Sequence, residues 1–316
     1  MTASKTQIVA IGGPTASGKS SLAMALGGLI PVELLNFDSM QIYRGMDIGT
    51  AKPGKEDRET IPHHLLDIRD PDELFSVGQY TPLFRDTVED IASRGPLPVA
   101  VGGTGLYLRG ALGGLIEGPG RDDDLRKELK SLEMGEPGVL YRMLVEKDPE
   151  TASRNKPRDM VRIIRALEVY ELTGMSISEL HREHSFRDRP FDAVIYCLNP
   201  ERATLYRWVE KRVDEMMEDG LLTEVEVLRD NGYGRDLPSM KALGYRELLA
   251  HLDGETSLEE AVELIKRNTR RYAKRQITWF KGEKGVRWLD ISHPDEIPSL
   301  AERIVTEIRE QDAETR

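Results

Sequence analysis

The sequence predicts an α/β fold in which helices flank a parallel sheet and one helical domain is inserted. Short apolar runs alternate with helical patterns, which is typical of parallel α/β sheets. One long stretch, at about residues 120–190, has helical patterns but no run that suits a strand. At 316 residues the chain is long enough for about two domains. We therefore expect a core domain from residues 1–119 and 191–316, and a helical insertion domain at 120–190.

Five apolar runs are expected to form the strands, at residues 8–11, 33–37, 99–101, 194–198 and 286–289. Three helices are expected in the insertion, at residues 125–132, 138–147 and 157–173. The last of these ends before Gly174, and glycine is the usual residue just beyond a helix C-terminus. After the insertion, amphipathic patterns predict helices at residues 202–220 and 258–279.

A P-loop motif follows the first apolar run, where the sequence reads Gly13-Pro14-Thr15-Ala16-Ser17-Gly18-Lys19-Ser20 and matches G-x-x-x-x-G-K-[ST]. A helical pattern begins at Ser20, so backbone N–H groups and the helix dipole would favour a phosphate here. Lys19 would reach the terminal phosphate, and the Ser20 hydroxyl would reach Mg²⁺. These features predict a P-loop NTPase-like core. The alternative is an ordinary glycine-rich turn, and the motif alone does not identify the phosphorylated ligand.

Polar residues also follow two other expected strands. Asp38 comes directly after residues 33–37, where it could accept a proton or hold a water of Mg²⁺; its alternative role is a helix N-cap. Gly102, Gly103 and Thr104 follow the run that ends at residue 101. Two glycines allow the backbone to approach a ligand closely, although such pairs also form tight turns. Ligands of open α/β sheets bind beyond the carboxyl ends of the strands, so both groups are candidate site residues.

The charge distribution points to a polyanionic partner. The formal net charge of −11 argues weakly against general nucleic-acid binding, but a local basic surface is the better indicator. Residues 266–281 contain seven basic residues and no acidic one. Four of them, Arg267, Arg271, Lys274 and Arg275, recur at helical spacing and should share one face. A second basic group comprises Arg154, Lys156, Arg158, Arg162 and Arg165. A solvated helix face is the alternative for each group.

Several other classes of site are disfavoured. The single cysteine, Cys197, lies in an apolar run and is interpreted as a buried core thiol. His63, His64 and His181 do not suggest a metal site, because the adjacent pair should point in different directions and no cysteine is near. No signal peptide precedes the first strand, and no apolar stretch has the length of a membrane span. We therefore expect a cytoplasmic protein that does not associate with membranes.

Six segments together resemble the tRNA dimethylallyltransferase family. They are DSMQIYRGMDIGTAKP at residues 38–53, PHHLLDI at 62–68, GGTGLY at 102–107, RALEV at 165–169, LGYR at 243–246 and KRQITWF at 274–280. The resemblance runs from about residue 8 to 290, with the motifs in the family's order. It implies transfer of a dimethylallyl group from dimethylallyl diphosphate to the exocyclic amine of the adenine 3′ of the tRNA anticodon, at position 37. Some relatives carry a C-terminal zinc finger, but residues 290–316 contain no cysteine.

The resemblance also implies roles for individual residues. The whole P-loop, from Gly13 to Ser20, would hold the donor diphosphate with Mg²⁺ on Ser20, and no ATP would be consumed. Arg212 occupies the position of a family arginine that contacts the diphosphate. Trp208 stands where another arginine is common, so Arg207 is an alternative contact. Asp38 would be the general base for the adenine amine, with Thr104 helping to position it.

The partner that the resemblance implies is the tRNA anticodon stem-loop, bound by a monomer, with the reacting base extruded from its stack. The family's tRNA contacts map onto Asp38, Ser39, Met40, Gln41, Thr104, Arg126, Val161, Arg162, Ile163, Ile164, Arg165, Lys241, Ala242, Leu243, Gly244, Tyr245, Arg246, Lys274, Arg275, Gln276, Ile277, Thr278, Trp279, Phe280 and Lys281. Both basic groups overlap these positions. Three alternatives are an isopentenyltransferase acting on free adenine nucleotides, a P-loop kinase of small molecules, and an RNA-binding protein with a vestigial P-loop.

Overall fold

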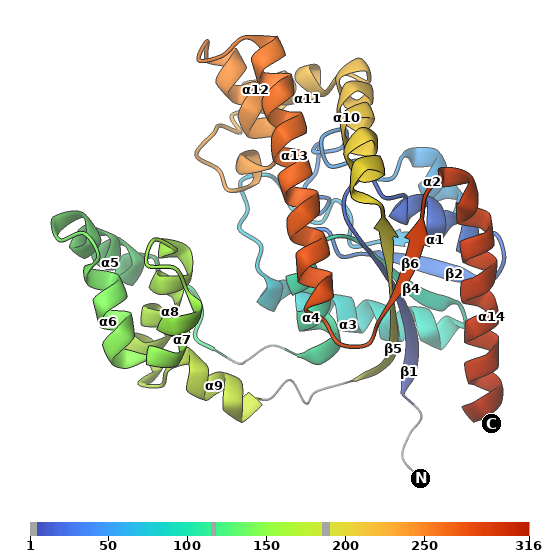
Figure 1. The fold of residues 1–316 in the computed structure, drawn as a ribbon, viewed down its shortest axis with the longest axis horizontal. Coiled ribbons are helices and arrows are strands. Elements are labelled where there is room, and N and C mark those ends of the chain that lie inside the picture. Colours follow the sequence, from blue (N-terminus) through green and yellow to red (C-terminus); the bar gives the residue numbers. More distant parts are fainter. Residues whose placement is uncertain (1–4, 115–117, 185–189, 316) are drawn as a thin grey trace. The chain divides into compact units, whose positions relative to one another are not determined.

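The computed structural model describes residues 5–114, 118–184 and 190–315 (Figure 1). The chain forms two compact units, one made of Met1–Leu112 with Pro190–Arg316 and the other of Gly113–Arg189. The sequence places the inserted domain at 120–190, and the second unit begins a little earlier. The parts of the expected domains at residues 1–4, 115–117, 185–189 and 316 lie outside the described residues.

The first unit is built on a parallel sheet, as predicted. Within the described ranges the sheet has six strands in the order β3-β2-β4-β1-β5-β6, and all neighbours are parallel. The strands are β1 (Thr6–Gly12), β2 (Val32–Asn36), β3 (His63–His64), β4 (Leu97–Val101), β5 (Phe191–Pro200) and β6 (Val286–Ile291). All five expected strands are present, and the α/β prediction is confirmed. The short edge strand β3 was not predicted.

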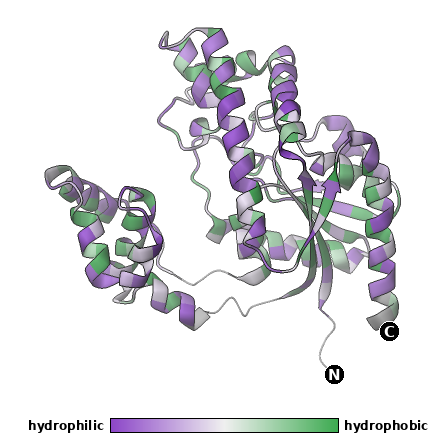
Figure 2. Cartoon of the chain, viewed as in Figure 1, coloured by the Kyte–Doolittle hydropathy of each residue, from purple (hydrophilic) through white to green (hydrophobic). Residues whose placement is uncertain are grey.

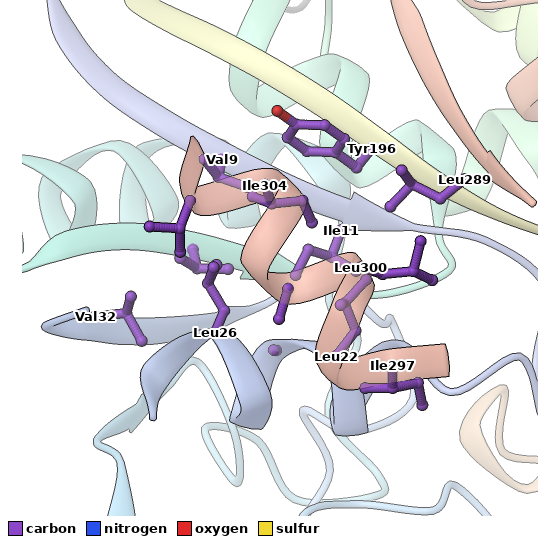
Figure 3. Packing of buried hydrophobic residues seen from close by; sticks show 14 of the residues in the cluster. Val9, Ile11, Leu22, Leu26, Val32, Tyr196, Leu289, Ile297, Leu300 and Ile304 are labelled. Atoms are coloured by element: carbon purple, nitrogen blue, oxygen red, sulfur yellow. The ribbon is translucent and has the colours of Figure 1, made fainter. Parts of the chain in front are cut away.

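Helices cover both faces of this sheet. Along β1, Val9 and Ile11 belong to one hydrophobic cluster, whereas Ile8 and Ala10 belong to another, as the alternation of a strand requires. The first cluster lies under α1 (Lys19–Gly27) and α14 (Ile297–Thr315), and Figure 3 shows Leu22 and Leu26 of α1 in the same cluster as Leu300 and Ile304 of α14. The second lies under α3 (Val77–Arg94) and α4 (Gly105–Gly113). Both faces of β1 are therefore buried, which fixes the P-loop that follows it.

A group of helices after β5 forms a third hydrophobic cluster with residues 42–46. It includes α10 (Arg202–Glu218), α11 (Leu221–Asp230), α12 (Tyr245–Leu252) and α13 (Leu258–Lys281); a 3₁₀ turn, η1, spans Ser239–Lys241. The start of α13 is fixed by a capping box, because Ser257 accepts from the Glu260 backbone while the Glu260 side chain accepts from the Ser257 backbone. Much of α13 is hydrophilic (Figure 2). Helix α2 (Lys55–Thr60) and the turn η2 (Pro294–Glu296) complete the unit.

Among its described residues, the inserted unit has helices joined by short connections and no strand, as expected. Its helices are α5 (Asp123–Gly135), α6 (Val139–Lys147), α7 (Pro149–Arg154), α8 (Met160–Thr173) and α9 (Ile177–His184). Helix α8 begins later than residue 157 because Asp159 is its N-cap, and it ends at Gly174 in the left-handed conformation, as predicted. The unit has a hydrophobic core of its own. In the described part of the chain, no helix has the length and apolar character of a membrane span.

Candidate active site

The P-loop has the backbone geometry of an anion cradle. Gly13 and Gly18 have φ of 140° and 90°, and Ala16 has a left-handed φ of 64°, which is uncommon for a residue with a Cβ. Gly18 is the N-cap of α1, so Lys19 and Ser20 occupy its first turn. The loop therefore points the N-terminus of α1 at the cavity beyond β1, where a negative charge is favoured.

This cavity has a volume of about 440 Å³ and collects groups from distant parts of the chain. The P-loop contributes residues 15–20, and the segment after β2 contributes residues 38–41. Other walls come from residues 241–244 and from side chains of α10 and α13. Gly13 and Pro14 are buried beneath the loop and do not line the cavity. Most of the predicted diphosphate-binding residues are thus brought to one place.

Beside the P-loop, two of the cations that line this cavity, Lys19 and Arg212, lie with one unpartnered hydroxyl. Burial, and then the charge of Arg212, lower the pKa of Lys19 to about 8. The Lys19 ammonium donates a hydrogen bond to the Pro14 carbonyl at 2.7 Å. The Ser17 hydroxyl is buried and has no hydrogen-bond partner among the described residues. Two converging cations with an unsatisfied hydroxyl are suited to a multiply charged anion with several acceptor oxygens.

Of the two arginines considered for the diphosphate, Arg212 lines the cavity and Arg207 does not. Arg212 lies on α10, lines the cavity wall and interacts electrostatically with both Lys19 and Asp38. Arg207 is exposed and donates a hydrogen bond to the Thr204 hydroxyl at 3.1 Å. Because the two residues lie on different faces of α10, the geometry favours Arg212 as the second cation.

Asp38 is held in a defined orientation beside the P-loop. Its Oδ1 accepts the Met40 N–H at 2.9 Å, and its own N–H donates to the Asn36 side chain at 2.8 Å. Burial raises the pKa of Asp38, although the hydrogen bond from Met40 and the charge of Lys19 oppose this. A raised pKa makes the carboxylate a better proton acceptor. The bond to the Met40 N–H is a local turn, and Asp38 caps no helix.

Thr104 supports the segment that carries Asp38. Its hydroxyl accepts the Ser39 N–H at 3.0 Å and donates to the Ser39 hydroxyl at 3.2 Å. Thr104 itself does not line the cavity, whereas Ser39 does. The loop after β4 and the loop after β2 are therefore tied together at the carboxyl ends of two adjacent strands.

Two residues of the site were missed by reasoning from the sequence. Tyr272 of α13 lines the cavity, and burial, reinforced by the charge of Asp38, raises its pKa. Glu224 of α11 accepts the backbone N–H groups of residues 47–49, at 3.0, 2.7 and 3.1 Å, and the Tyr245 hydroxyl at 2.6 Å. Residues 49–51 line the cavity, so Glu224 fixes part of its wall. Neither residue stands in a local motif; the helical spacing of Tyr272 from Gln276 was the available signal.

The basic face predicted on α13 is present. Arg267, Arg271, Lys274 and Arg275 are exposed, and no acidic group among the described residues lies within 4 Å of their charges. By contrast, Lys266 and Arg270 on the flank of the helix pair with Asp214 and Glu210 of α10. Arg275 also lines the cavity. The basic face therefore extends from the surface to the rim of the site.

The segments expected to contact tRNA divide between surface and core. Lys241, Arg246, Lys274, Arg275, Thr278 and Lys281 are exposed. Gly244, Tyr245, Gln276 and Phe280 are buried, and Ala242, Leu243, Ile277 and Trp279 are partly buried. Phe280 packs in the second core cluster, so close to β1 that a Cβ on Gly12 would lie 2.5 Å from its ring. Within these segments, the exposed residues are therefore the ones available to contact a ligand at the surface.

In the inserted unit two of the expected contact residues, Arg126 and Arg165, pair with a buried glutamate. Arg126 donates two hydrogen bonds to the buried Glu168, at 2.6 and 2.8 Å, and Arg165 donates a third at 2.6 Å. Although burial opposes ionisation, these guanidiniums lower the pKa of Glu168 to about 2. Ile163 and Ile164 are buried in the core of the unit, whereas Val161 and Arg162 are exposed.

Cys197, His63 and His64 lie in surroundings that suit structural residues. Burial raises the pKa of Cys197 to about 12, which keeps this core thiol protonated. His63 contacts the Ile61 carbonyl and His64 contacts Glu33, so the adjacent rings point to different partners. Within the described ranges, no three His, Cys, Asp or Glu side chains are grouped so that they could hold a metal.

Relatives match this chain over nearly its whole length. The family model of IPP transferases matches residues 41–283. The tRNA dimethylallyltransferase 2 of Geotalea daltonii is 50% identical over 288 residues, which cover 90% of this chain and 88% of the relative. The tRNA dimethylallyltransferase of Thermotoga petrophila is 46% identical over 303 residues, covering 95% and 98% of the two chains.

Solved structures agree with the sequence relatives. The tRNA isopentenylpyrophosphate transferase of Bacillus halodurans has a TM-score of 0.72 at 40% identity, and the match covers 99% of this chain and 100% of the Bacillus chain. A eukaryotic dimethylallyltransferase acting on tRNA has a TM-score of 0.81 at 30% identity, covering 98% of this chain and 80% of its own. Matches of this extent show common descent as well as a common fold. The chain therefore belongs to the IPP transferase family, to which the tRNA dimethylallyltransferases belong.

Proposed function

We propose that this protein transfers the dimethylallyl group of dimethylallyl diphosphate to the exocyclic amine of adenine 37 in tRNA and releases diphosphate. One observation carries the proposal: a single cavity joins an anion cradle, Lys19 and Arg212, to the carboxylate of Asp38. The basic face of α13 reaches the rim of this cavity through Arg275. Because one chain supplies all of these groups, the proposal needs no second subunit, and it places the protein in the cytoplasm with its tRNA substrate.

In the proposed reaction the amine nitrogen attacks C1 of the dimethylallyl group while the bond from C1 to the diphosphate oxygen breaks. The bonding electrons leave with diphosphate, whose charge Lys19, Arg212 and the P-loop N–H groups stabilise. The amine proton passes to the carboxylate of Asp38, whose raised pKa suits a general base. Thr104 acts through Ser39 by holding the segment that carries Asp38. Positioned proton transfer of this kind is worth about 10²–10⁴ in rate.

The residues present fit Mg²⁺ that is bound mainly by the donor. The Ser20 hydroxyl is exposed in the first turn of α1, and Asp38 provides a carboxylate on the same cavity wall. Mg²⁺ prefers oxygen ligands and keeps several waters, so it does not need a cluster of carboxylates. We propose that Ser20 holds it together with diphosphate oxygens and water. When bound, it would supply further neutralisation of the departing charge.

The direct test supplies the purified protein with Mg²⁺ and radiolabelled dimethylallyl diphosphate, and offers unmodified tRNA, AMP or ATP as acceptor. Label is expected in tRNA alone, in a nucleoside that nuclease digestion releases as isopentenyladenosine. A matched tRNA with guanine at position 37 should remain unlabelled. Label in AMP but not in tRNA would contradict the proposed acceptor. Full activity after chelation of divalent ions would contradict the proposed role of Mg²⁺.

A further inference from the structure

Helix α13 lies so close to the loops at the strand ends that glycine is required beneath it. A Cβ on Gly103 would lie 2.1 Å from Nε2 of Gln276, and one on Gly105 would lie 2.1 Å from the Trp279 ring. Contacts under 3.0 Å do not occur between real Cβ atoms and their neighbours. The loop after β4 and one face of α13 are therefore packed closely, backbone against side chain.

Gln276 makes the polar contacts of this interface. It is 5% exposed, its Oε1 accepts the Thr15 N–H at 2.8 Å, and its Nε2 donates to the Gly103 carbonyl at 3.1 Å. Thr15 belongs to the P-loop, and Gly103 directly precedes Thr104. One buried amide thus joins α13 to both the loop that cradles the anion and the loop that supports Asp38. An unpaired buried amide is costly, so both bonds should persist together.

The opposite face of the same helix is the unpaired basic face that ends at Arg275. An RNA phosphate bound there would fix the helix on its outer side, while Gln276 fixes the two loops on its inner side. We propose that Gln276 is a positioning residue that couples RNA binding on α13 to the order of the P-loop and the Thr104 loop. This inference rests on the proposed function, because it takes RNA and a diphosphate as the two ligands.

Coupling of this kind is measured as a change in the affinity for one ligand when the other is bound, and it is reciprocal. The experiment titrates the full chain with inorganic pyrophosphate and Mg²⁺ by calorimetry, with and without a saturating anticodon stem-loop RNA. In the wild type, RNA should tighten pyrophosphate binding by about 5-fold or more. In Gln276→Leu, which loses both hydrogen bonds at similar volume, this factor should fall to about 1. Binding of pyrophosphate alone should weaken by about 2- to 13-fold, the net worth of one hydrogen bond.

A conservative variant and a matched control separate coupling from folding. Gln276→Glu retains an acceptor for the Thr15 N–H but has no donor for the Gly103 carbonyl, so its coupling factor should be intermediate. Thermal unfolding would show whether Gln276→Leu folds. If it does not, the coupling factor of Gln276→Glu tests the proposed role of Gln276. Glu263→Gln changes an exposed side chain of the same helix and should retain the wild-type factor.

Two results would overturn the inference. The first is a wild-type protein that binds both ligands independently, and the second is an unchanged coupling factor in Gln276→Leu or Gln276→Glu. Failure of the proposed function has a different signature. In that case the wild type would bind neither the stem-loop RNA nor pyrophosphate, or would show no prenyl transfer.

Discussion

The pKa of Lys19 predicts where the pH profile of the reaction should fall. Burial and the charge of Arg212 bring this pKa to about 8, so the ammonium is roughly 90% charged at pH 7 and about 10% charged at pH 9. Donor binding requires the charged form. We therefore expect kcat/KM for dimethylallyl diphosphate to fall about tenfold for each pH unit above 8, since this parameter reports the free enzyme.

Two variants test whether deprotonation of Lys19 causes the decline of kcat/KM above pH 8. Lys19→Arg keeps its charge throughout the accessible range, so its kcat/KM should be lower overall but should not decline between pH 8 and 9.5. Arg212→Gln removes a neighbouring positive charge and should move the decline to higher pH, in addition to weakening donor binding. Glu263→Gln lies on an exposed surface and should keep the wild-type profile.

The assay is initial-rate transfer of radiolabel into tRNA at subsaturating donor, from pH 7 to 9.5. A decline that stays at the same pH in Lys19→Arg would assign it to another group and refute the argument. A wild-type profile that remains flat up to pH 9.5 would also refute it, because it would give Lys19 an ordinary pKa.

Three further predictions concern separate parts of the site. Asp38→Asn should lower the single-turnover rate of transfer by about 10²–10⁴-fold while equilibrium binding of the donor survives; lost donor binding would instead make this carboxylate a metal or phosphate ligand. Arg271→Gln should weaken tRNA affinity and reduce the slope of log Kd against log salt by about 1, and an unchanged slope would make this residue a solvated surface charge. Gly105→Ala should lower the free energy of unfolding by about 1–3 kcal/mol, because its Cβ would meet the Trp279 ring at 2.1 Å. Gly234→Ala, which meets nothing within 4 Å, should leave the thermal midpoint unchanged, and equal midpoints in both alanine variants would contradict the packing argument.

The central strands β2, β4, β1 and β5 could be predicted because strands inside a parallel sheet are buried on both faces and are largely apolar, as in residues 8–11 of β1. The edge strand β6 was also predicted, from residues 286–289. The edge strand β3 gave no such signal, because it has two residues, both histidine, and pairs with β2 through its backbone. The predicted start of α8, at residue 157, was too early. The helix begins at Met160, because the Asp159 side chain accepts the Arg162 N–H and caps it.

The catalytic side of the site could be predicted because its residues follow strands. Asp38 and Thr104 lie at neighbouring carboxyl ends, and this alone brings them together. The residues that were missed are held by distant partners. Tyr272 interacts with Thr104, more than 150 residues away in the sequence, and Glu224 reaches residues 47–49. No local pattern identifies such contacts, because they depend on how α11 and α13 pack on the sheet.

The family resemblance assigns tRNA binding to whole segments of the sequence. Where a segment is helical, its residues point to different sides of the helix, and only one side can face tRNA. In residues 274–281, Lys274, Arg275 and Lys281 face solvent, whereas Gln276 and Phe280 face the sheet. Substitutions in this one segment should therefore fall into two kinetic classes. Changes on the outer face should alter tRNA affinity and its salt dependence, whereas changes on the inner face should alter the response of the donor site to bound RNA. The segment is better understood as a two-sided connection between RNA and the P-loop than as a continuous RNA contact.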